Sequence, residues 1–291
     1  MTALINQVVS ESPTGARAIS ELSAAVGVSR ATYYRRRGAT VLRPAGETER
    51  RRMIHQVALE MPNYGHRFIT AELQRRGLAT GRDRVLRYMR EEQLLCRRPR
   101  AFVVTTNSAH GQPVFPNLAR DLQLTAVDQL WVADITYIKL PREFVYLAVL
   151  LDAYSRRVIG WALERHLMTE LTLAALKMAL ATRVVTPQLV HHSDRGTQYA
   201  AADYVALLFK HQIRISMSRP GNPYDNAKAE RFMRTVKYDE VYLADYQNLT
   251  EARASIRRFI EDVYNRKRLH SALGYRPPAE FEQLFSQPIR T

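Results

Sequence analysis

The stretch that decides the fold is residues 130–163, LWVADITYIKLPREFVYLAVLLDAYSRRVIGWAL. It contains three segments rich in β-branched and aromatic residues, Leu130–Lys139, Phe144–Leu151 and Arg157–Leu163, which predict three strands. The linking segments LPRE and DAYSR are too short for a helix, so each strand must turn back on the one before it. We therefore predict an antiparallel meander at the start of a sheet.

Helices and strands alternate after the meander. The pattern predicts, in order, a helix at Thr169–Arg183 capped by Thr169, a strand at Gln188–His192, a helix at Tyr199–His211, a strand at Ile213–Met217, a helix from Ala227 and a last helix at Thr250–Tyr264. Residues 266–278 read as a basic loop. This order is that of the ribonuclease-H-like fold, an α/β fold with a mixed five-stranded sheet flanked by helices. In that fold the first and fourth strands are neighbours.

The N-terminal part predicts all-α structure in two helical hairpins. Residues 18–37, AISELSAAVGVSRATYYRRR, place a glycine turn before Ser29, which can cap a basic second helix. This spacing resembles helix-turn-helix DNA-binding modules, with an ordinary helical hairpin as the alternative. A helix at Glu49–Leu59 and a break at PNYG lead into residues 66–95, which repeat the plan. For this second hairpin, DNA reading and contact with a partner protein both stay open.

These patterns divide the chain into five parts. We predict a helix-turn-helix DNA-binding domain at 1–40, a second helix-turn-helix-like domain at 41–100, a connector at 101–122, a ribonuclease-H-like catalytic domain at 123–285 and a tail at 286–291.

Composition favours a polyanionic partner. The net charge is +15, and the first 110 residues are rich in Arg and contain no Lys. Nucleic acid is preferred over membrane, because no basic amphipathic helix or lipidation motif is evident. A single cysteine, Cys96, excludes a disulfide framework and a Cys/His zinc cluster built from this chain. No signal peptide or membrane-spanning run is recognisable, so we expect a cytoplasmic, DNA-associated protein in a bacterium.

The segment Ser218–Asp239, SRPGNPYDNAKAERFMRTVKYD, predicts a helix with two different sides. Helical spacing places Glu230, Arg234 and Lys237 on one side, and the apolar residues Ala229, Phe232 and Val236 on roughly the opposite side. Asp225 or Asn222 is the expected cap. A solvated i,i+4 pair is the ordinary reading of Glu230 and Arg234 taken alone.

Two further acids change that interpretation. Asp134 lies inside the apolar run of the first strand, where an ionised carboxylate is costly without a counter-charge. Asp194 follows the fourth predicted strand, directly before a Gly turn. In the predicted fold both would converge with Glu230. Three carboxylates repel one another unless cations lie between them, and oxygen ligands suit Mg²⁺ or Mn²⁺ in the two-ion arrangement used for attack at phosphorus.

The acids and their surroundings resemble a known family. Fifty-nine residues separate Asp134 from Asp194 and 35 separate Asp194 from Glu230, within the motifs WVADITYI, HHSDRGTQY and RPGNPYDNAKAERFMRTVK. This D-x59-D-x35-E pattern resembles the DDE transposases and retroviral integrases, and most closely the OrfB-type catalytic chain of insertion-sequence family three. The likeness covers residues 18–282. One departure is YGHRF at 64–68, where the family more often has an aromatic and a second basic residue after the Gly.

The resemblance implies an activity and its partners. It implies a Mg²⁺- or Mn²⁺-dependent DNA transposase, with two ions per active site held by Asp134, Asp194 and Glu230, that cleaves and transfers strands. Lys237 matches the basic residue near the DNA. Terminal repeats of an insertion sequence and target DNA are the implied substrates, without a covalent protein–DNA link. Because two ends are joined in one event, we expect a homodimer or larger assembly.

Further candidate residues follow from charge and position. The predicted DNA-binding residues are Arg30, Arg35, Arg36, Arg37, Arg82, Arg84, Arg234 and Lys237. His192 and Asp152 are second-tier site candidates. His192 either lines the site or is simply packed, and Asp152 reads as a strand-end or turn residue. We expect Trp131, Tyr137 and Trp161 in the core.

Two other function classes stay open at this point. A DNA-binding regulator would use the nuclease fold as a scaffold and would bind without metal-dependent nicking. A structure-selective nuclease, such as a junction resolver, would cut branched DNA whatever its terminal sequence, and would leave the two front hairpins without a purpose.

Overall fold

The structure is a computed structural model that describes Ser29 and residues 45–95, 113–219 and 223–286. The first predicted hairpin therefore lies outside the described residues apart from Ser29. The chain divides into two compact units, Met1–Gln56 and Val57–Thr291. No helix of the described ranges is long and apolar enough to cross a membrane.

A five-stranded mixed sheet forms the centre of the second unit, in the order β3-β2-β1-β4-β5. Its strands are β1 (Leu130–Lys139), β2 (Phe144–Asp152), β3 (Val158–Glu164), β4 (Val190–Ser193) and β5 (Arg214–Met217). The first three strands are antiparallel neighbours, whereas β4 is parallel to β1 and β5 is parallel to β4. The predicted meander and the pairing of the first and fourth strands are confirmed.

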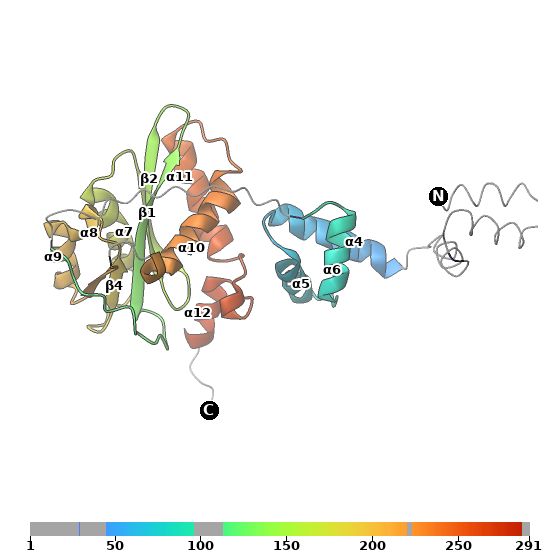
Figure 1. Cartoon of the computed structure of the whole chain (residues 1–291), viewed down its shortest axis with the longest axis horizontal. Coiled ribbons are helices and arrows are strands. Elements are labelled where there is room, and N and C mark those ends of the chain that lie inside the picture. The colour runs from blue at the N-terminus through green and yellow to red at the C-terminus, as the bar shows by residue number, and fades with distance from the viewer. Residues whose placement is uncertain (1–28, 30–44, 96–112, 220–222, 287–291) are drawn as a thin grey trace, which may run out of the picture. The chain divides into compact units, whose positions relative to one another are not determined.

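Helices cover both faces of the sheet (Figure 1). On one face lie α7 (Thr169–Thr182), α8 (Thr197–Ala200) and α9 (Ala202–Lys210), and on the other lie α10 (Ala227–Val236) and α11 (Leu249–Arg258). Two separate apolar clusters result. Leu176, Tyr199 and Tyr204 belong to the first, and Phe232, Val236 and Ile256 to the second. Trp131 and Trp161 are buried as predicted.

Gly160 allows α7 to lie directly against β3. A Cβ atom at this position would stand 2.1 Å from the backbone oxygen of Ala175. No side chain fits at that distance, so the close approach of helix and strand requires glycine. This contact seats α7 on the outer strand of the meander.

Two predicted helix caps are wrong. Met168, and not Thr169, is the N-cap of α7, and no side chain bonds the first N–H groups there. The N-cap of α10 is Asn226, also without a side-chain bond to the helix. Asp225 instead accepts hydrogen bonds from the backbone N–H and the guanidinium of Arg219. Asn222 lies outside the described residues. Neither helix start therefore has a side-chain cap bond.

The last third of the chain contains more helix than the sequence predicts. The expected helix at 199–211 is broken at Ala201, whose extended backbone separates α8 from α9. The π-helix η2 (Lys237–Val241) continues α10, and the π-helix η3 (Phe259–Tyr264) continues α11. The segment predicted as a basic loop contains a 3₁₀ turn at Ser271–Leu273, and the helix α12 (Pro278–Ser286) follows it. That helix was not predicted.

The second predicted hairpin is present. Helix α4 (Ala45–Glu60) begins four residues before the predicted start at Glu49, and α5 (His66–Arg75) and α6 (Arg82–Glu91) follow. Gly77 ends α5 with a φ of 81°, and the N–H of Leu78 bonds the carbonyl of Leu73. This left-handed turn favours glycine. Ile69 and Leu73 of α5, together with Val85 and Met89 of α6, are fully buried.

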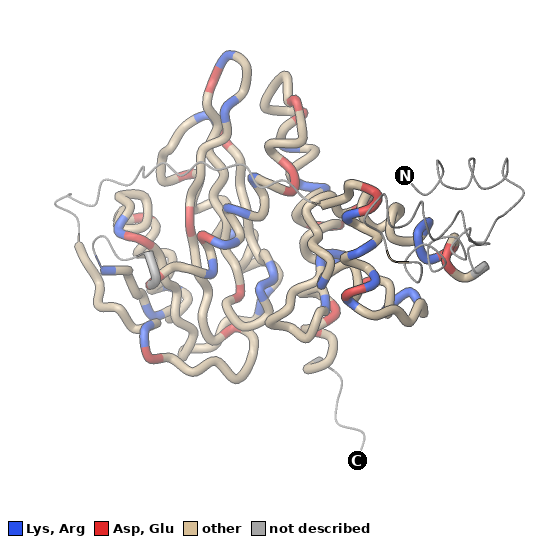
Figure 2. Tube along the Cα trace, turned by 45° about the vertical axis from the view of Figure 1, so that its right-hand side comes forward, with Lys and Arg blue, Asp and Glu red and all other residues tan. Residues whose placement is uncertain are grey.

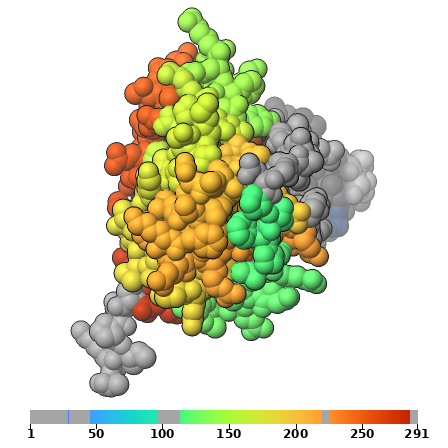
Figure 3. Space-filling view, turned by 90° about the vertical axis from the view of Figure 1, so that its left-hand side faces the viewer, coloured from blue at the N-terminus to red at the C-terminus, as the bar shows by residue number. Residues whose placement is uncertain are grey.

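The described end of the predicted connector lies along the core. Phe115 contacts Phe209 of α9 with 6.4 Å between ring centroids, and the N–H of Leu118 donates to the hydroxyl of Ser216 on β5 at 2.8 Å. Figure 3 shows this segment, in green, on the surface beside the orange residues of α9 and β5. Its path therefore covers the β5 side of the sheet.

Charged residues occur throughout the described trace. Figure 2 shows Lys and Arg along both the helical hairpin and the core, with Asp and Glu interspersed. The basic excess is thus not confined to one element.

Candidate active site

The register between β1 and β4 brings Asp134 and Asp194 together. Their pairing ends at Val132 and His192, and each aspartate lies two residues further along the chain, Asp134 inside β1 and Asp194 directly after the last residue of β4. Because both acids lie two positions beyond the same pair, both carboxylates point to the same face of the sheet. Alternation along β1 makes this the face of Leu130 and Val132, which belong to the apolar cluster beneath α10.

Helix α10 brings Glu230 to that same face. Its apolar side is buried against the sheet, as predicted, through Ala229, Phe232 and Val236, while Glu230 stays exposed. Asn226, only 4% exposed, donates its side-chain N–H to the carbonyl of Ala133 at 2.9 Å. Because Ala133 directly precedes Asp134, this hydrogen bond fixes the start of α10 beside the carboxylate. Asn226 was not among the predicted site residues.

The three acids interact electrostatically through Asp134. Burial, the Asp194 carboxylate and Glu230 together raise the pKa of Asp134 to about 8, although a hydrogen bond from the Ile135 N–H and the charge of Lys237 act in the opposite direction. Burial also raises the pKa of Glu230. The pKa of Asp134 therefore reports a negative cluster that the protein's own cations only partly offset.

Gly196 allows the Asp194 carboxylate to accept a hydrogen bond from the backbone of the turn that follows it. The N–H of Gly196 donates to Oδ1 of Asp194 at 2.9 Å. A Cβ atom on Gly196 would stand 3.0 Å from that same oxygen and 3.2 Å from the side-chain oxygen of Gln198. The glycine therefore leaves room for the orientation that the carboxylate adopts.

Two predicted basic residues lie near the acids. Lys237 lies beside Asp134, and Arg234 lies on the same side of α10 as Glu230. The ammonium of Lys237 stands 4.8 Å from the ring centroid of Tyr137, and burial lowers its pKa while Asp134 opposes that shift. Tyr137 is therefore only partly buried and contacts Lys237, contrary to the expectation of a core residue. Arg234 is exposed, with its guanidinium 5.6 Å from the ring of Tyr238.

The donor set fits divalent metal ions. All three acids offer oxygen ligands, and their like charges favour a cation between them. In the part of the chain that the structure describes, no three His, Cys, Asp or Glu side chains are gathered closely enough to share one ion. The arrangement instead contains two interacting pairs, Asp134 with Asp194 and Asp134 with Glu230.

His192 is packed. It is fully buried, and its ring nitrogens lie 2.7 Å from the Ser216 hydroxyl and 3.0 Å from the Ser218 hydroxyl. Burial lowers the pKa of His192 to about 4, so the ring is neutral near pH 7. The geometry therefore agrees with the interpretation of His192 as a packed residue rather than one that lines the site.

Asp152 closes the turn between β2 and β3. Its carboxylate accepts hydrogen bonds from the N–H groups of Asp128, Tyr154 and Ser155 and from the Ser155 hydroxyl. It is fully buried and all of these bonds are internal to the turn and the start of β1. The geometry agrees with the strand-end reading of this residue.

An ion-pair network extends from that turn to α12. Glu282, with 9% of its side chain exposed, accepts from the Ser155 hydroxyl at 2.7 Å, from Arg157 at 2.6 Å and from Arg183 at 2.6 Å. Arg183 also pairs with Asp128 at 3.4 Å. Every buried charge in this network has a partner, and the sequence analysis found none of these pairings.

A basic cluster on the other flank of α10 was also missed. It comprises Arg156 from the β2–β3 turn together with Lys228 and Arg231 from α10. Burial and the charge of Arg156 lower the pKa of Lys228 to about 8. Within the described residues, no carboxylate forms an ion pair with any of the three. Lys228 and Arg231 share a helix side by spacing, but only the fold brings Arg156 to them.

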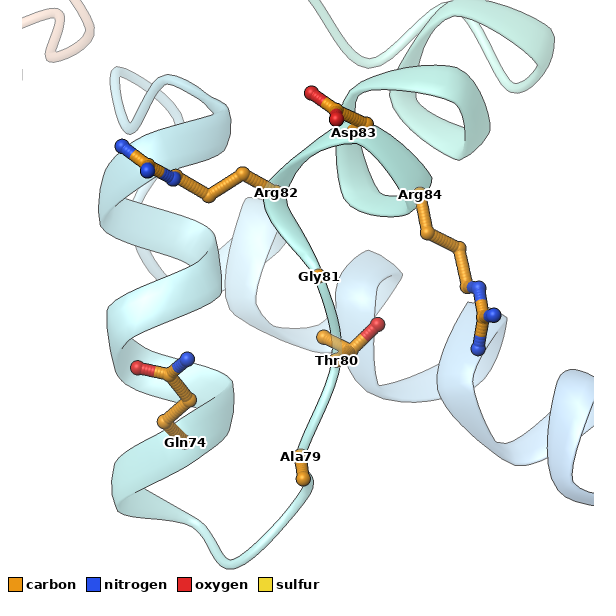
Figure 4. A pocket seen from close by; sticks show the side chains of 7 residues that line it. All are labelled: Gln74, Ala79, Thr80, Gly81, Arg82, Asp83 and Arg84. Atoms are coloured by element: carbon orange, nitrogen blue, oxygen red, sulfur yellow. The ribbon is translucent and has the colours of Figure 1, made fainter.

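Arg82 and Arg84 flank the start of α6. Both are exposed and, with Gln74 and Thr80, line a pocket of about 480 Å³ beside Gly81 (Figure 4). Figure 4 shows the two guanidinium groups extending to either side of the turn. No side chain caps the N-terminus of α6. The predicted residues Arg30, Arg35, Arg36 and Arg37 lie outside the described residues.

Three family profiles match the chain. An integrase core domain matches residues 125–223, a second integrase core domain matches residues 211–278, and an HTH-like domain matches residues 45–102. Together they span the described hairpin and the sheet with its acids.

Curated relatives match over most of their length. An uncharacterised 31 kDa protein of insertion element IS600 from Shigella sonnei is 42% identical over 225 residues, which are 77% of this chain and 83% of that protein. The InsF transposase of insertion sequence IS3A from Escherichia coli (strain K12) is 37% identical over 220 residues, covering 75% of this chain and 76% of that transposase. The chain belongs to the IS3 family of transposases.

A similar solved structure is the catalytic core domain of BIV integrase. It covers 55% of the transposase and 96% of the integrase chain, at 20% identity and a TM-score of 0.42.

Family membership confirms the predicted function. The transposase is a polynucleotidyl transferase of DNA transposition, with strand transfer and dependence on divalent metal. Its HTH-like and integrase core domains are DNA-binding. A purely regulatory role and a structure-selective nuclease role are therefore set aside.

Proposed function

We propose that Asp134, Asp194 and Glu230 are the metal-binding and catalytic residues of this transposase, with two Mg²⁺ or Mn²⁺ ions per site. The observation that carries this proposal is geometric: the β1–β4 pairing ends two positions before both aspartates, and the Asn226–Ala133 hydrogen bond holds the start of α10, with Glu230, beside them. Asp134 would belong to both pairs of ligands, with Asp194 completing one pair and Glu230 the other. When bound, such ions activate the attacking water or 3′-hydroxyl and stabilise the leaving oxygen.

The residues around the acids have roles of their own in this proposal. Asn226 holds α10, and with it Glu230, at a fixed place beside Ala133. Lys237 lies where its ammonium can meet a scissile phosphate next to Asp134, and exposed Arg234 can meet the flanking backbone. His192 and Asp152 are not needed for a chemical step, since their hydrogen bonds are internal.

DNA binding is assigned to the hairpin and to the N-terminal module. We place Arg82 and Arg84 on the DNA backbone, because an uncapped helix N-terminus and two exposed guanidinium groups attract phosphate together. Arg30 and Arg35–Arg37 stay predicted DNA contacts. The substrates proposed are the terminal repeats of an insertion sequence and target DNA.

The proposed domain plan keeps the predicted boundaries. It comprises DNA-binding modules at 1–40 and 41–100, the connector at 101–122, the catalytic domain at 123–285 and the tail at 286–291. A homodimer or larger synaptic complex is proposed, because two element ends must meet in one reaction.

Replacing Glu230 by Gln tests the catalytic assignment. We expect cleavage of a labelled element end in Mg²⁺ to fall by about a thousandfold or more, since a metal ligand is lost. Binding of the same duplex should change little, as measured by gel shift. The control is Glu170→Gln, which removes the same charge from the exposed start of α7. Unchanged cleavage in Glu230→Gln would remove this residue from the site.

The same assay distinguishes the proposed substrates. We expect end-specific nicks and joined products with terminal-repeat duplexes, and no preference for a branched duplex of unrelated sequence. Equal cutting of branched DNA would contradict the assignment of terminal repeats.

A further inference from the structure

The hairpin helix α5 and the turn before it contact the C-terminal segment of the same compact unit. Asn63 donates its side-chain N–H to the carbonyl of Tyr238 at 2.9 Å. The hydroxyl of Tyr64 accepts the N–H of Leu269 at 2.6 Å. Neither contact is local, because each joins residues about two hundred positions apart in the chain. The turn at residues 62–65, which the sequence predicts only as a break between helices, thus attaches the hairpin to the C-terminal segment.

Further contacts continue along α5. The ring of Phe68 meets that of Tyr275 edge-on, with 5.4 Å between centroids. Arg75 forms a two-point ion pair with Glu280 of α12, at 3.1 and 2.5 Å. Because Phe68 and Arg75 lie seven residues apart on one side of the helix, the contacts fix its direction as well as one point on it. The orientation of the hairpin relative to the C-terminal segment is therefore fixed.

Tyr64 is the centre of this interface. It is 4% exposed, and Leu269 is fully buried. Burial raises the pKa of Tyr64 to about 12, so the phenol is neutral and its oxygen serves as an acceptor. Removing that oxygen would leave a buried N–H group without an acceptor, which is unfavourable. The aromatic ring alone cannot supply this hydrogen bond.

The docking surface is continuous with the catalytic site. Tyr238, which Asn63 contacts, directly follows Lys237 in the π-helix η2. Asp239 of the same π-helix pairs with Arg268 at 2.7 Å, and both side chains are largely buried. Arg268 directly precedes Leu269, the partner of Tyr64. The segment that positions Lys237 beside Asp134 is thus the segment on which the hairpin rests.

The basic side of the hairpin stays free of this interface. Within the described residues, the four contacts named above come from α5 and its preceding turn, whereas Arg82, Arg84, Arg87 and Arg90 of α6 are exposed. A helix-turn-helix places its second helix against DNA. An anchored α5 leaves α6 free for this contact.

We propose that Asn63 and Tyr64 are positioning residues that hold α6 at a fixed reach from Lys237 and the three acids. Hairpin and catalytic centre then grip DNA as one body, and the distance between them sets where the strand is cut. The proposal rests on the proposed function. An HTH-like domain by itself implies DNA binding, and the proposal adds a role in positioning the DNA at the catalytic site.

Tyr64→Phe and Asn63→Ala test the proposal in the full chain. The probe is a 5′-labelled duplex carrying the terminal repeat that flanks the coding sequence. We expect gel-shift affinity within about twofold of wild type, while single-turnover cleavage falls about tenfold and cuts spread over neighbouring positions. Equally fast cleavage at one unchanged position in both variants would overturn the proposal. If wild type itself cut no probe, the proposed function and not the docking would be at fault.

Cross-linking keeps the proposal testable where a variant folds poorly. In a Cys96→Ser background, Arg75→Cys and Glu280→Cys are joined by a short bis-maleimide. We expect efficient linkage and cleavage at the wild-type position within about twofold, because the ion-pair partners already touch. Failure to link, or linkage that abolishes cleavage, would show that the hairpin works undocked. The unlinked double variant is the control.

Discussion

Two acidic clusters lie on the same sheet and differ in one respect. Beside the start of β1, Asp152 and Glu282 are buried, and N–H groups, hydroxyls and arginines satisfy them. Beside the middle of β1, Asp134 interacts with the carboxylates of Asp194 and Glu230, and Lys237 is the cation that lowers its pKa among the described residues. Acids paired with arginines contribute to the structure, whereas like charges held close together are typical of sites that bind a ligand. The contrast matches the proposed division between structural acids and catalytic acids.

The largest effect is expected from a substitution in the proposed catalytic cluster of Asp134, Asp194 and Glu230. Asp134→Asn should reduce strand cleavage by about a thousandfold or more, because a ligand shared by both metal pairs is lost. Thermal unfolding should be unchanged or shifted upward, since the substitution removes like-charge repulsion. Cleavage on a gel and a thermal melt measure the two effects. A large drop in melting temperature would mean that Asp134 is a structural acid.

The second prediction concerns the buried ion pairs of Glu282, where a substitution should lower stability and leave cleavage unchanged. Glu282→Gln should lower the free energy of unfolding by about 3 kcal/mol, because the buried Arg183 loses the shorter of its two ion pairs and keeps only the one with Asp128 at 3.4 Å. Cleavage at a temperature where the variant is folded should remain near wild type. Denaturant titration measures the loss. The matched control is Glu261→Gln, which removes the exposed ion pair of Glu261 with Arg257.

The third prediction concerns acid. Burial alone would raise the pKa of Glu282, but the charge and hydrogen bond of Arg183, with Ser155 and Arg157, lower it below the ordinary 4.5. A lowered folded-state pKa gives stability that is present above the ordinary value and is lost as pH falls below it. Wild type should therefore lose stability below about pH 4.5 more steeply than Glu282→Gln. Parallel pH profiles would contradict the pairing.

A smaller effect should appear when metal is added. Mg²⁺ or Mn²⁺ well above its dissociation constant should stabilise the wild type by about 1–3 kcal/mol, because only the folded chain gathers the acids. Asp134→Asn should respond much less, while Glu282→Gln should respond as wild type does. Differential scanning fluorimetry with and without a chelator measures the shifts. An equal response of wild type and Asp134→Asn would place the metal elsewhere.

The smallest expected effect concerns the basic cluster beside α10. Lys228→Ala with Arg231→Ala should weaken DNA binding a few-fold and reduce its salt dependence by about one to two counterions, since no carboxylate of the described residues forms an ion pair with either cation. Fluorescence anisotropy over a salt series measures both. The matched control is Lys177→Ala with Lys210→Ala, two exposed lysines on the opposite face of the sheet.

Much of the fold was predictable because its pattern is local. The meander strands show their period directly, and the register of β1 with β4 follows once their order is known, so Asp134 and Asp194 could be matched in advance. Glu230 followed from helical spacing. The chemistry of these residues is written in short motifs.

The remainder depends on contacts between distant segments. Nothing near Glu282 in the sequence indicates Ser155 or Arg183 as its partners, and α12 lacks a strong local signal. Tyr64 sits in a turn whose partner, Leu269, is fixed only by the folded chain. Asn226 reads as a turn residue, although its amide reaches β1. Predicted caps failed for the same reason, because tertiary packing overrides local preference.

The shared register of β1 and β4 has a practical consequence for engineering. The two strands meet through backbone pairing, so the number of residues between Asp134 and Asp194 is itself free to change. A peptide tag inserted between Pro141 and Arg142, at the exposed tip of the β1–β2 hairpin, would lengthen that spacing and leave the acids facing each other. One extra residue between Val132 and Asp134 would instead turn the aspartate to the opposite face of the sheet.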